Sequence, residues 1–230
     1  MSVRDNLASV RERIAGAARN SGRDTSSVRL MAVSKFHPAD AVIEAMDAGQ
    51  TLFGENRVQE ATEKFAAIRA LGREPELHII GQLQRNKVSK IVGVASCVQS
   101  VDRPELLEEI ARQAASKNLV MEVLFEFHTG EESKAGYADA DSLFRSIDLL
   151  ERMPTVRCKG LMTMAPFTDD KNAVRSSFRT LAKLREECAK RYPNLDFSVL
   201  SMGMSGDYGI AIEEGSTLVR VGTAIFGERA

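Results

Sequence analysis

The chain has 230 residues, of which 43% are hydrophobic and 27% are charged, and its formal net charge is −1. That length suits one large domain with a full hydrophobic core. A net charge close to zero gives no electrostatic footprint for nucleic acid or for an anionic membrane surface, so neither is expected as a partner.

The first half of the chain alternates helical patterns with short apolar runs. An amphipathic helix with Leu7, Val10, Ile14 and Ala17 on one face comes before the first strand. Short apolar runs predict strands at 28–33, 51–53, 77–80 and 97–101. Apolar residues at helical spacing, with proline or glycine at some ends, predict helices at 38–49, 58–68, 88–92 and 104–114.

The second half of the chain repeats this rhythm. Strands are predicted at 119–127, 156–162, 197–200 and 217–221. Helical patterns between them predict helices at 143–150, 174–188 and 210–214. No linker rich in proline, glycine or serine divides the sequence, so residues 1–230 are interpreted as a single domain.

Eight strands that alternate with helices favour parallel pairing with the helices outside. Eight is also the number of strands that closes a (β/α)8 barrel of the TIM type. We therefore predict an α/β fold of this kind, with the extra N-terminal helix capping or flanking the barrel. An open, doubly wound sheet is the alternative architecture.

The cysteines and the apolar segments indicate in which cellular compartment the protein is expected. Cys97, Cys158 and Cys188 stand far apart, and no two have the spacing of metal ligands, so we expect reduced, buried thiols and no metal site. The N-terminal helical pattern lacks the continuous apolar segment of a signal peptide. No stretch approaches the ~20 apolar residues that span a bilayer. These features predict a cytoplasmic protein.

Lys35 directly follows the first predicted strand. In a barrel of this kind ligands bind at the carboxyl ends of the strands, so the side chain is expected at the barrel mouth. Desolvation there favours the neutral amine, which can attack an aldehyde. The alternative is a lysine that extends from the rim into solvent.

Small residues follow strands seven and eight. The small-residue loop 201–205 contains Ser201 and Ser205, and Gly222 and Thr223 follow the last strand. Backbone N–H groups and hydroxyls in such loops bind phosphate, and barrel phosphate sites commonly form after these two strands. The alternative is a pair of tight turns with glycine where φ is positive. Because closure makes strand eight the neighbour of strand one, the amine and the phosphate loops are expected side by side.

With these residues in place, the sequence closely resembles the pyridoxal phosphate homeostasis protein family over nearly its whole length. The segments that carry the resemblance are AVSK at 32–35, FGENRVQE at 53–60, HIIGQLQRNK at 78–87, QSVDRPELLEEI at 99–110, TGEESKAGY at 129–137, KGLMTMAP at 159–166, LSMGMSGDY at 200–208 and STLVRVGTAIFGER at 216–229. Each segment alone is weak, but all of them in this order are specific.

The resemblance implies a barrel like the N-terminal domain of alanine racemase, with pyridoxal 5′-phosphate held as a Schiff base. By position, it implies that the aldehyde of the cofactor is bound by Lys35, that the phosphate is bound by Ser205, Gly222 and Thr223 with Ser201 as a further candidate, that the pyridine nitrogen faces Arg220, and that Asn56 lies close to the ring.

Three residues depart from the pattern of this family. Phe36 stands where threonine is frequent, Leu77 where tryptophan is usual, and His128 where asparagine is common. We expect Phe36 and His128 to affect the rim of the pocket, and thus access of a ligand, more than the lysine linkage. His128 is also considered as a base, against the simpler interpretation of a polar residue at a strand end.

The resemblance leaves a choice between a carrier and an enzyme. A racemase of this fold has a second, β-rich domain that supplies an opposing base, and with the sequence ending at Ala230 we expect none here. Arg220 beside the pyridine nitrogen would keep it unprotonated and make the ring a poorer electron sink. We therefore expect a protein that carries or buffers the cofactor, with no catalytic residue assigned.

Other functions and partners stay open at this stage. The first alternative is an amino-acid racemase or aldolase-type enzyme that depends on pyridoxal 5′-phosphate, and a further one is a regulatory protein whose cofactor site is a sensor. Apoenzymes that need the cofactor are the expected recipients, and the chain is expected to be a monomer. Arg57, Arg85 and Lys87 are considered as a second basic site, against the interpretation of solvated rim charges.

Overall fold

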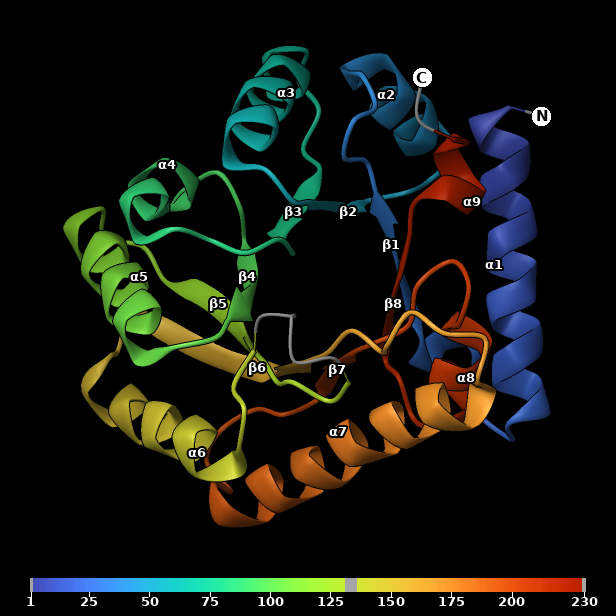
Figure 1. Cartoon of the computed structure of the whole chain (residues 1–230). Helices are drawn as coiled ribbons and strands as arrows, with labels where there is room; N and C mark the ends of the chain where they lie inside the picture. The colour runs from blue at the N-terminus through green and yellow to red at the C-terminus, as the bar shows by residue number, and fades with distance from the viewer. Residues whose placement is uncertain (1, 131–135, 229–230) are drawn as a thin grey trace.

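The computed structural model describes residues 2–130 and 136–228. Its strands pair in sequence order, all in parallel, and β1 also pairs with β8, so the sheet closes into a barrel (Figure 1). Closure excludes the open sheet and confirms the predicted TIM-type barrel. The strands are β1 (Arg29–Val33), β2 (Leu52–Glu55), β3 (Glu76–Ile79), β4 (Cys97–Val101), β5 (Met121–Glu126), β6 (Val156–Met162), β7 (Val199–Ser201) and β8 (Leu218–Val221).

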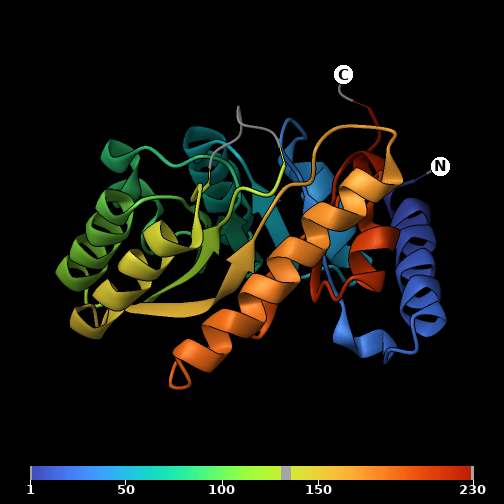
Figure 2. The same cartoon turned by 60° about the horizontal axis from the view of Figure 1, so that its bottom comes forward.

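Helices surround the barrel, as the tilted view in Figure 2 also shows. The α-helices are α1 (Val3–Asn20), α2 (Ala39–Asp47), α3 (Val58–Ala70), α4 (Val88–Ile91), α5 (Pro104–Ser116), α6 (Ala140–Asp148), α7 (Lys171–Arg191), α8 (Tyr208–Glu213) and α9 (Thr223–Phe226). Short 3-10 helices are η1 (Thr25–Ser27), η2 (Arg85–Lys87) and η3 (Leu149–Arg152). The sequence did not predict α9.

The first helix, α1, stands in the outer ring, where it contacts α2, α8 and α9 (Figure 1). It begins with a capping box between Ser2 and Asp5, and it buries Leu7, among other apolar residues, against the core. The Asn6 side-chain amide donates to the carbonyl of Ile225 at 2.9 Å. Arg11 donates to the carbonyls of residues 48 and 49, both at 2.8 Å. The helix therefore flanks the barrel, beside the short α8.

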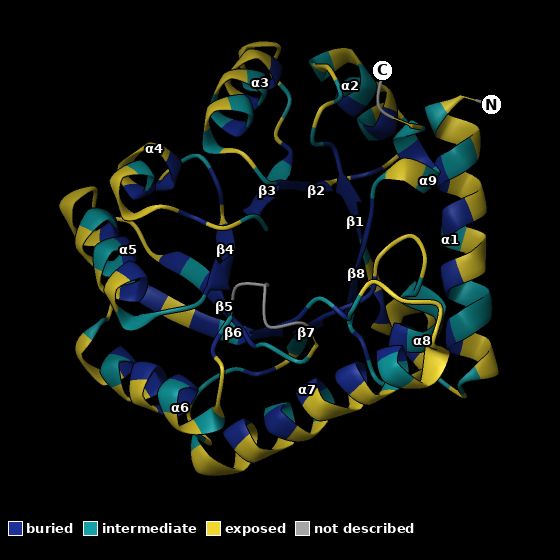
Figure 3. Ribbon diagram, in the orientation of Figure 1, coloured by how far each residue is buried: buried dark blue, intermediate teal, exposed yellow. Residues whose placement is uncertain are grey.

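The buried residues form two regions. An apolar layer lies between the strands and the surrounding helices, and the interior of the barrel holds both apolar and polar side chains. The strands are largely buried and the helices are exposed on their outer faces (Figure 3). One large cluster packs the strands against the helices, and two small apolar clusters include Met31 and Leu124, respectively. Polar side chains are buried too, and they include His78, Gln99, Ser201 and Arg220. Such groups require hydrogen-bond partners inside the barrel.

Gly160 shows how closely two strands approach. Its φ is +144°, and a Cβ atom there would lie 1.8 Å from the carbonyl oxygen of Val199 on β7. The pairing of β5 with β6 shifts register beside it. Only glycine fits this position, because any side chain would push β6 away from β7.

Two further properties concern membranes and metals. In residues 2–130 and 136–228, no helix combines the length and apolarity needed to cross a membrane. Within the same ranges, no three His, Cys, Asp or Glu side chains are grouped so that they could hold a metal ion.

Candidate cofactor site

A cavity of about 470 Å³ lies where the carboxyl ends of the strands meet. We call it the mouth cavity. It is lined by residues that include Lys35, Asn56, Ser205, Arg220, Gly222 and Thr223. Six of the seven residues predicted for a cofactor site are therefore together around one space. The seventh, Ser201, is fully buried and does not line this cavity.

The position of Lys35 is set by the residue before it. The Ser34 N–H donates to the carbonyl of Gly54 at 3.1 Å, and its hydroxyl donates to Oε1 of Glu55 at 2.8 Å. Lys64 Nζ donates to the carbonyl of Ser34 at 2.8 Å, and to Glu55 at the same distance. These bonds tie the end of β1 to β2 and α3, so the backbone that carries Lys35 is held firmly at the mouth cavity.

Phe36, one of the departures from the family pattern, does not line the mouth cavity. Its φ is +68°, a left-handed conformation that is rare for a bulky residue. Its N–H donates to Oε1 of Glu60 at 2.6 Å, and its ring lies 4.8 Å from the guanidinium carbon of Arg57. The sharp turn at Phe36 places Lys35 and His37 at the cavity wall.

His37 lines the mouth cavity and was not selected from the sequence. Its ring stacks on that of Phe226, with the centroids 5.1 Å apart. Burial lowers the pKa of His37, and the nearby Lys64 ammonium lowers it further. A neutral imidazole therefore faces the cavity at neutral pH. Its place two residues after Lys35 was the only signal in the sequence.

Two loops bring backbone N–H groups to the cavity. The N–H groups of Ser205, Gly206, Gly222 and Thr223 donate no hydrogen bond within the described part of the chain. Gly222 passes so near β1 that a Cβ atom would lie 3.1 Å from the carbonyl oxygen of Val33. Such unbonded donors beside two hydroxyls are what an anion such as phosphate requires.

Asn56 also shows an unsatisfied group at the cavity. Its Oδ1 is buried and accepts no hydrogen bond within residues 2–130 and 136–228. A buried acceptor without a donor is costly, at about 1–3 kcal/mol. A hydroxyl or N–H of a ligand in the cavity could supply the missing donor.

Arg220 supplies a positive charge at the cavity wall. Its Nη1 donates to the carbonyl and to the hydroxyl of Ser201, at 2.8 and 2.7 Å, and its Nη2 donates to the carbonyl of Thr163 at 2.8 Å. Burial lowers the pKa of Arg220 to about 10, against an opposing effect of the nearby Glu126 carboxylate. The guanidinium therefore stays charged at neutral pH and is fixed in orientation.

Glu126 ends β5 close to Arg220, and its residue is 3% exposed. Burial raises the pKa of Glu126 to about 8, although the Arg220 charge favours ionisation. At neutral pH this carboxyl is therefore mostly protonated. Arg220 remains the charged member of the two.

The other sequence candidates lie elsewhere. Leu77 is fully buried in the core between sheet and helices. His128 follows β5, half-buried, and does not line the mouth cavity. Arg85 and Lys87 lie in η2, and neither lines this cavity. Glu55 and Lys64, whose side chains anchor Ser34, were not selected from the sequence. Glu55, like Glu60, lies in the segment FGENRVQE at 53–60.

Comparison with known proteins identifies the family. The family model for the alanine racemase N-terminal domain matches residues 5–230. Pyridoxal phosphate homeostasis protein from Aquifex aeolicus is 39% identical over 229 residues, which cover 100% of this chain and 99% of the relative. The Vibrio cholerae protein of the same name is 40% identical over 233 residues, covering 99% of this chain and 97% of the relative.

A solved structure agrees with these relatives. PipY of Synechococcus elongatus PCC7942, determined with pyridoxal phosphate bound, has a TM-score of 0.87 and 35% identity, covering 98% of this chain and 100% of PipY. The resemblance seen in the sequence is thus confirmed. The chain belongs to the alanine racemase N-terminal domain family and, within it, to the pyridoxal phosphate homeostasis proteins.

Proposed function

We propose that this chain binds pyridoxal 5′-phosphate in the mouth cavity, as a Schiff base on Lys35, and carries or buffers it. The observation that carries the proposal is one cavity with a lysine amine, a buried arginine and four unbonded backbone N–H groups on its wall. The bound cofactor in PipY, a relative with 35% identity, supports it.

The residues fit the parts of this cofactor. The N–H groups of Ser205, Gly222 and Thr223, with the two hydroxyls, would bind the phosphate. Arg220 would face the pyridine nitrogen, and the unsatisfied Oδ1 of Asn56 would accept a hydrogen bond from a ring substituent. The amine of Lys35 would condense with the aldehyde, forming a carbon–nitrogen double bond and releasing one water.

The same residues favour carriage over catalysis. When bound, the cofactor supplies an electrophilic carbon and an electron-withdrawing ring. Arg220 keeps its proton at neutral pH, because its pKa of about 10 lies well above 7. A cation at that place disfavours a protonated pyridine nitrogen and so weakens the ring as an electron sink. Apoenzymes that require the cofactor are the proposed recipients.

His37 favours a second candidate, a racemase or aldolase-type enzyme. Its imidazole is held neutral by burial and shares the cavity with Lys35. A neutral imidazole within reach of a substrate carbon could act as a base. Exchange of the α-proton of amino acids in D₂O, abolished by H37Q, would favour this candidate. Exchange no faster than with free cofactor would favour the carrier.

The linkage to Lys35 is tested by trapping. The purified protein with added pyridoxal 5′-phosphate should show the visible absorbance of a Schiff base, and borohydride should attach the cofactor to Lys35 in peptide mass spectrometry. K35A should lose both signals, because no other amine is proposed to reach the aldehyde. K90A is the matched control, since Lys90 is an exposed lysine on α4. Trapping on another lysine, or an unchanged signal in K35A, would contradict the proposal.

A further inference from the structure

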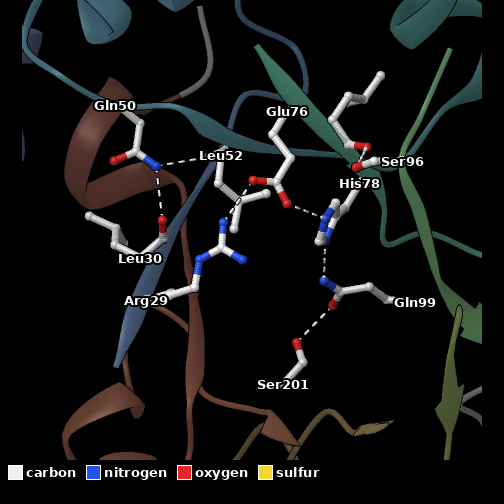
Figure 4. Close-up of polar contacts among 10 residues, drawn as sticks. Arg29, Leu30, Gln50, Leu52, Glu76, His78, Ser96, Gln99 and Ser201 are labelled. Atoms are coloured by element: carbon white, nitrogen blue, oxygen red, sulfur yellow. Dashed lines mark hydrogen bonds and ion pairs between the residues drawn. The ribbon is translucent and has the colours of Figure 1, made fainter. Parts of the chain in front are cut away.

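A line of buried polar side chains runs through the barrel interior from Arg220 towards the amino-terminal ends of the strands. The hydroxyl of Ser201 lies 2.7 Å from Nη1 of Arg220 and 2.7 Å from Oε1 of Gln99. Nε2 of Gln99 lies 2.8 Å from Nδ1 of His78, whose Nε2 lies 3.0 Å from Oε1 of Glu76 (Figure 4). Gln99 and Ser201 are fully buried, and His78 is 6% exposed.

The polarity of this line follows from its two ends. A guanidinium only donates, so the Ser201 oxygen accepts from Arg220 and its hydroxyl must donate to Gln99. The amide of Gln99 then turns its N–H₂ group towards His78, whose Nδ1 must accept. Nε2 of His78 therefore carries the proton and donates to Glu76. One arrangement of protons satisfies every group in the line.

Glu76 strengthens this polarity at the far end. Its hydrogen bond with His78 and the guanidinium of Arg29 at 2.7 Å hold the pKa of Glu76 at about 2. The carboxylate is therefore ionised at neutral pH and can only accept. It fixes the proton of His78 on Nε2 and leaves Nδ1 free to accept from Gln99.

We propose that His78 and Gln99 are positioning residues, which hold Ser201 as the acceptor for Arg220 and so orient the guanidinium at the mouth cavity. The purpose of this orientation, which is to bind the cofactor, rests on the proposed function. The hydrogen-bond line itself belongs to the protein without the cofactor. The two parts can therefore be tested separately.

The proton on His78 decides whether the line is intact. A second proton on Nδ1 would face the N–H₂ group of Gln99, so the amide would have to turn over. It would then offer an N–H to Ser201, whose hydroxyl would lose its acceptor. Charged and titratable groups on five strands surround His78 at the amino-terminal end, namely Arg29, Glu76, Cys97, Glu122 and Lys159. They meet His78 in a cavity of about 400 Å³.

The first experiment uses protein without cofactor. Nitrogen-15 NMR of the three histidines, with H78F to assign the signals, should show His78 with an unprotonated Nδ1 and a protonated Nε2. The N–H protons of Arg220 should exchange slowly with solvent. A His78 proton on Nδ1 would overturn the polarity, and fast exchange at Arg220 would overturn the orientation.

The second experiment breaks the line in the middle. Q99L removes both hydrogen bonds of the amide, and Q50L is the matched control. Gln50 is another buried glutamine, which donates to the carbonyls of Leu30 and Leu52 at 2.8 and 2.7 Å (Figure 4). These two bonds do not involve Arg220 or Ser201. Q99L should speed exchange at Arg220 about tenfold or more and weaken cofactor binding about ten- to a hundredfold. Q50L should change neither.

A third variant separates positioning from a loss of folding. Q99E keeps an acceptor for Ser201 but places a carboxylate beside Nδ1 of His78. It should keep slow exchange at Arg220, because the Ser201 hydroxyl still has an oxygen to which it can donate. Wild-type exchange and binding in Q99L would overturn the proposal, as would loss of slow exchange in a folded Q99E. If wild-type protein binds no cofactor, the proposed function fails, while the exchange data still decide the orientation of Arg220.

Discussion

At the scale of single residues, the charge at the mouth cavity depends on two buried ionisable groups, whose pKa values are shifted in opposite directions by burial. Burial lowers the pKa of Arg220 to about 10 and raises the pKa of Glu126 to about 8. At neutral pH the arginine is therefore charged and the carboxyl is mostly neutral. The local charge is positive, which favours an anionic ligand such as a phosphate ester.

This assignment predicts how E126Q changes stability with pH. In the unfolded chain the Glu126 carboxyl ionises near its ordinary pKa of 4.5, whereas in the folded chain it ionises near 8. The folded state thus binds more protons between these values, so the wild type loses stability as pH rises through that window. Glutamine cannot ionise, so E126Q should be more stable than wild type by about 4 kcal/mol near pH 9, and by under about 1 kcal/mol near pH 5.

Urea unfolding of both proteins at the two pH values measures this difference. The low-pH pair is the internal control, because pH 5 lies close to the ordinary pKa of 4.5, so little of the difference between the folded and unfolded states has developed there. A difference in stability that is the same at both pH values would show that Glu126 is ionised when folded.

Some of these residues could be predicted from the sequence and others could not. Lys35, Gly222 and Thr223 lie directly after strands, so the position of the strands in the sequence places them at the mouth. The contact between Lys64 and the fully buried Glu55 depends on how α3 packs on β2, and no spacing rule reports it. Only the ion pair of Lys64 with Glu60, four residues apart on α3, could be read from the sequence.

At the scale of elements, prediction succeeded where an apolar run and a strand coincide. The strands β4 and β6 have the predicted bounds. The strand β7 does not, because pairing extends to the polar Ser201, which satisfies its hydroxyl inside the barrel. The helix α9 was missed because four residues carry no periodic pattern. The periodicity of apolar residues in a sequence predicts which face of an element is buried. The polar pairs inside the barrel form only when the sheet closes, so this periodicity does not predict them.

The contact between β6 and β7 gives a prediction for one glycine. G160A should unfold the protein or destabilise it by at least about 3 kcal/mol, because the Cβ atom would lie 1.8 Å from the Val199 carbonyl oxygen at a φ that disfavours alanine. G16A is the matched control, since a Cβ atom at Gly16 on α1 meets nothing within 4 Å. It should stabilise by about 0.5–1 kcal/mol. Thermal unfolding by circular dichroism measures both, and a G160A protein as stable as wild type would contradict the close approach.

At the scale of the whole molecule, closure of the barrel makes distant segments depend on each other. One core cluster includes residues from α1, from the strands and from α7. The helix α1 packs beside α9, and its Asn6 donates to Ile225 two residues beyond Thr223 at the mouth cavity. A change at the N-terminal helix is therefore expected to reach the whole barrel rather than to loosen one edge.

The three cysteines can report this cooperativity. Cys97 on β4, Cys158 on β6 and Cys188 on α7 are all buried, and burial raises the pKa of each thiol, to about 12 for Cys158 and Cys188. A thiol reagent should therefore label none of them in the native protein at neutral pH, because the reactive thiolate is scarce and shielded.

With increasing urea, all three thiols should become reactive in one transition, which coincides with the loss of helix by circular dichroism. L7A, which truncates a fully buried side chain on α1, should shift that common transition by about 2–5 kcal/mol. L71A is the matched control, because Leu71 is 68% exposed and should leave the transition in place. Mass spectrometry of the labelled peptides distinguishes the three sites. If Cys188 were labelled at lower urea than Cys97, α7 would open before the barrel, and the single cooperative unit argued from closure would be wrong.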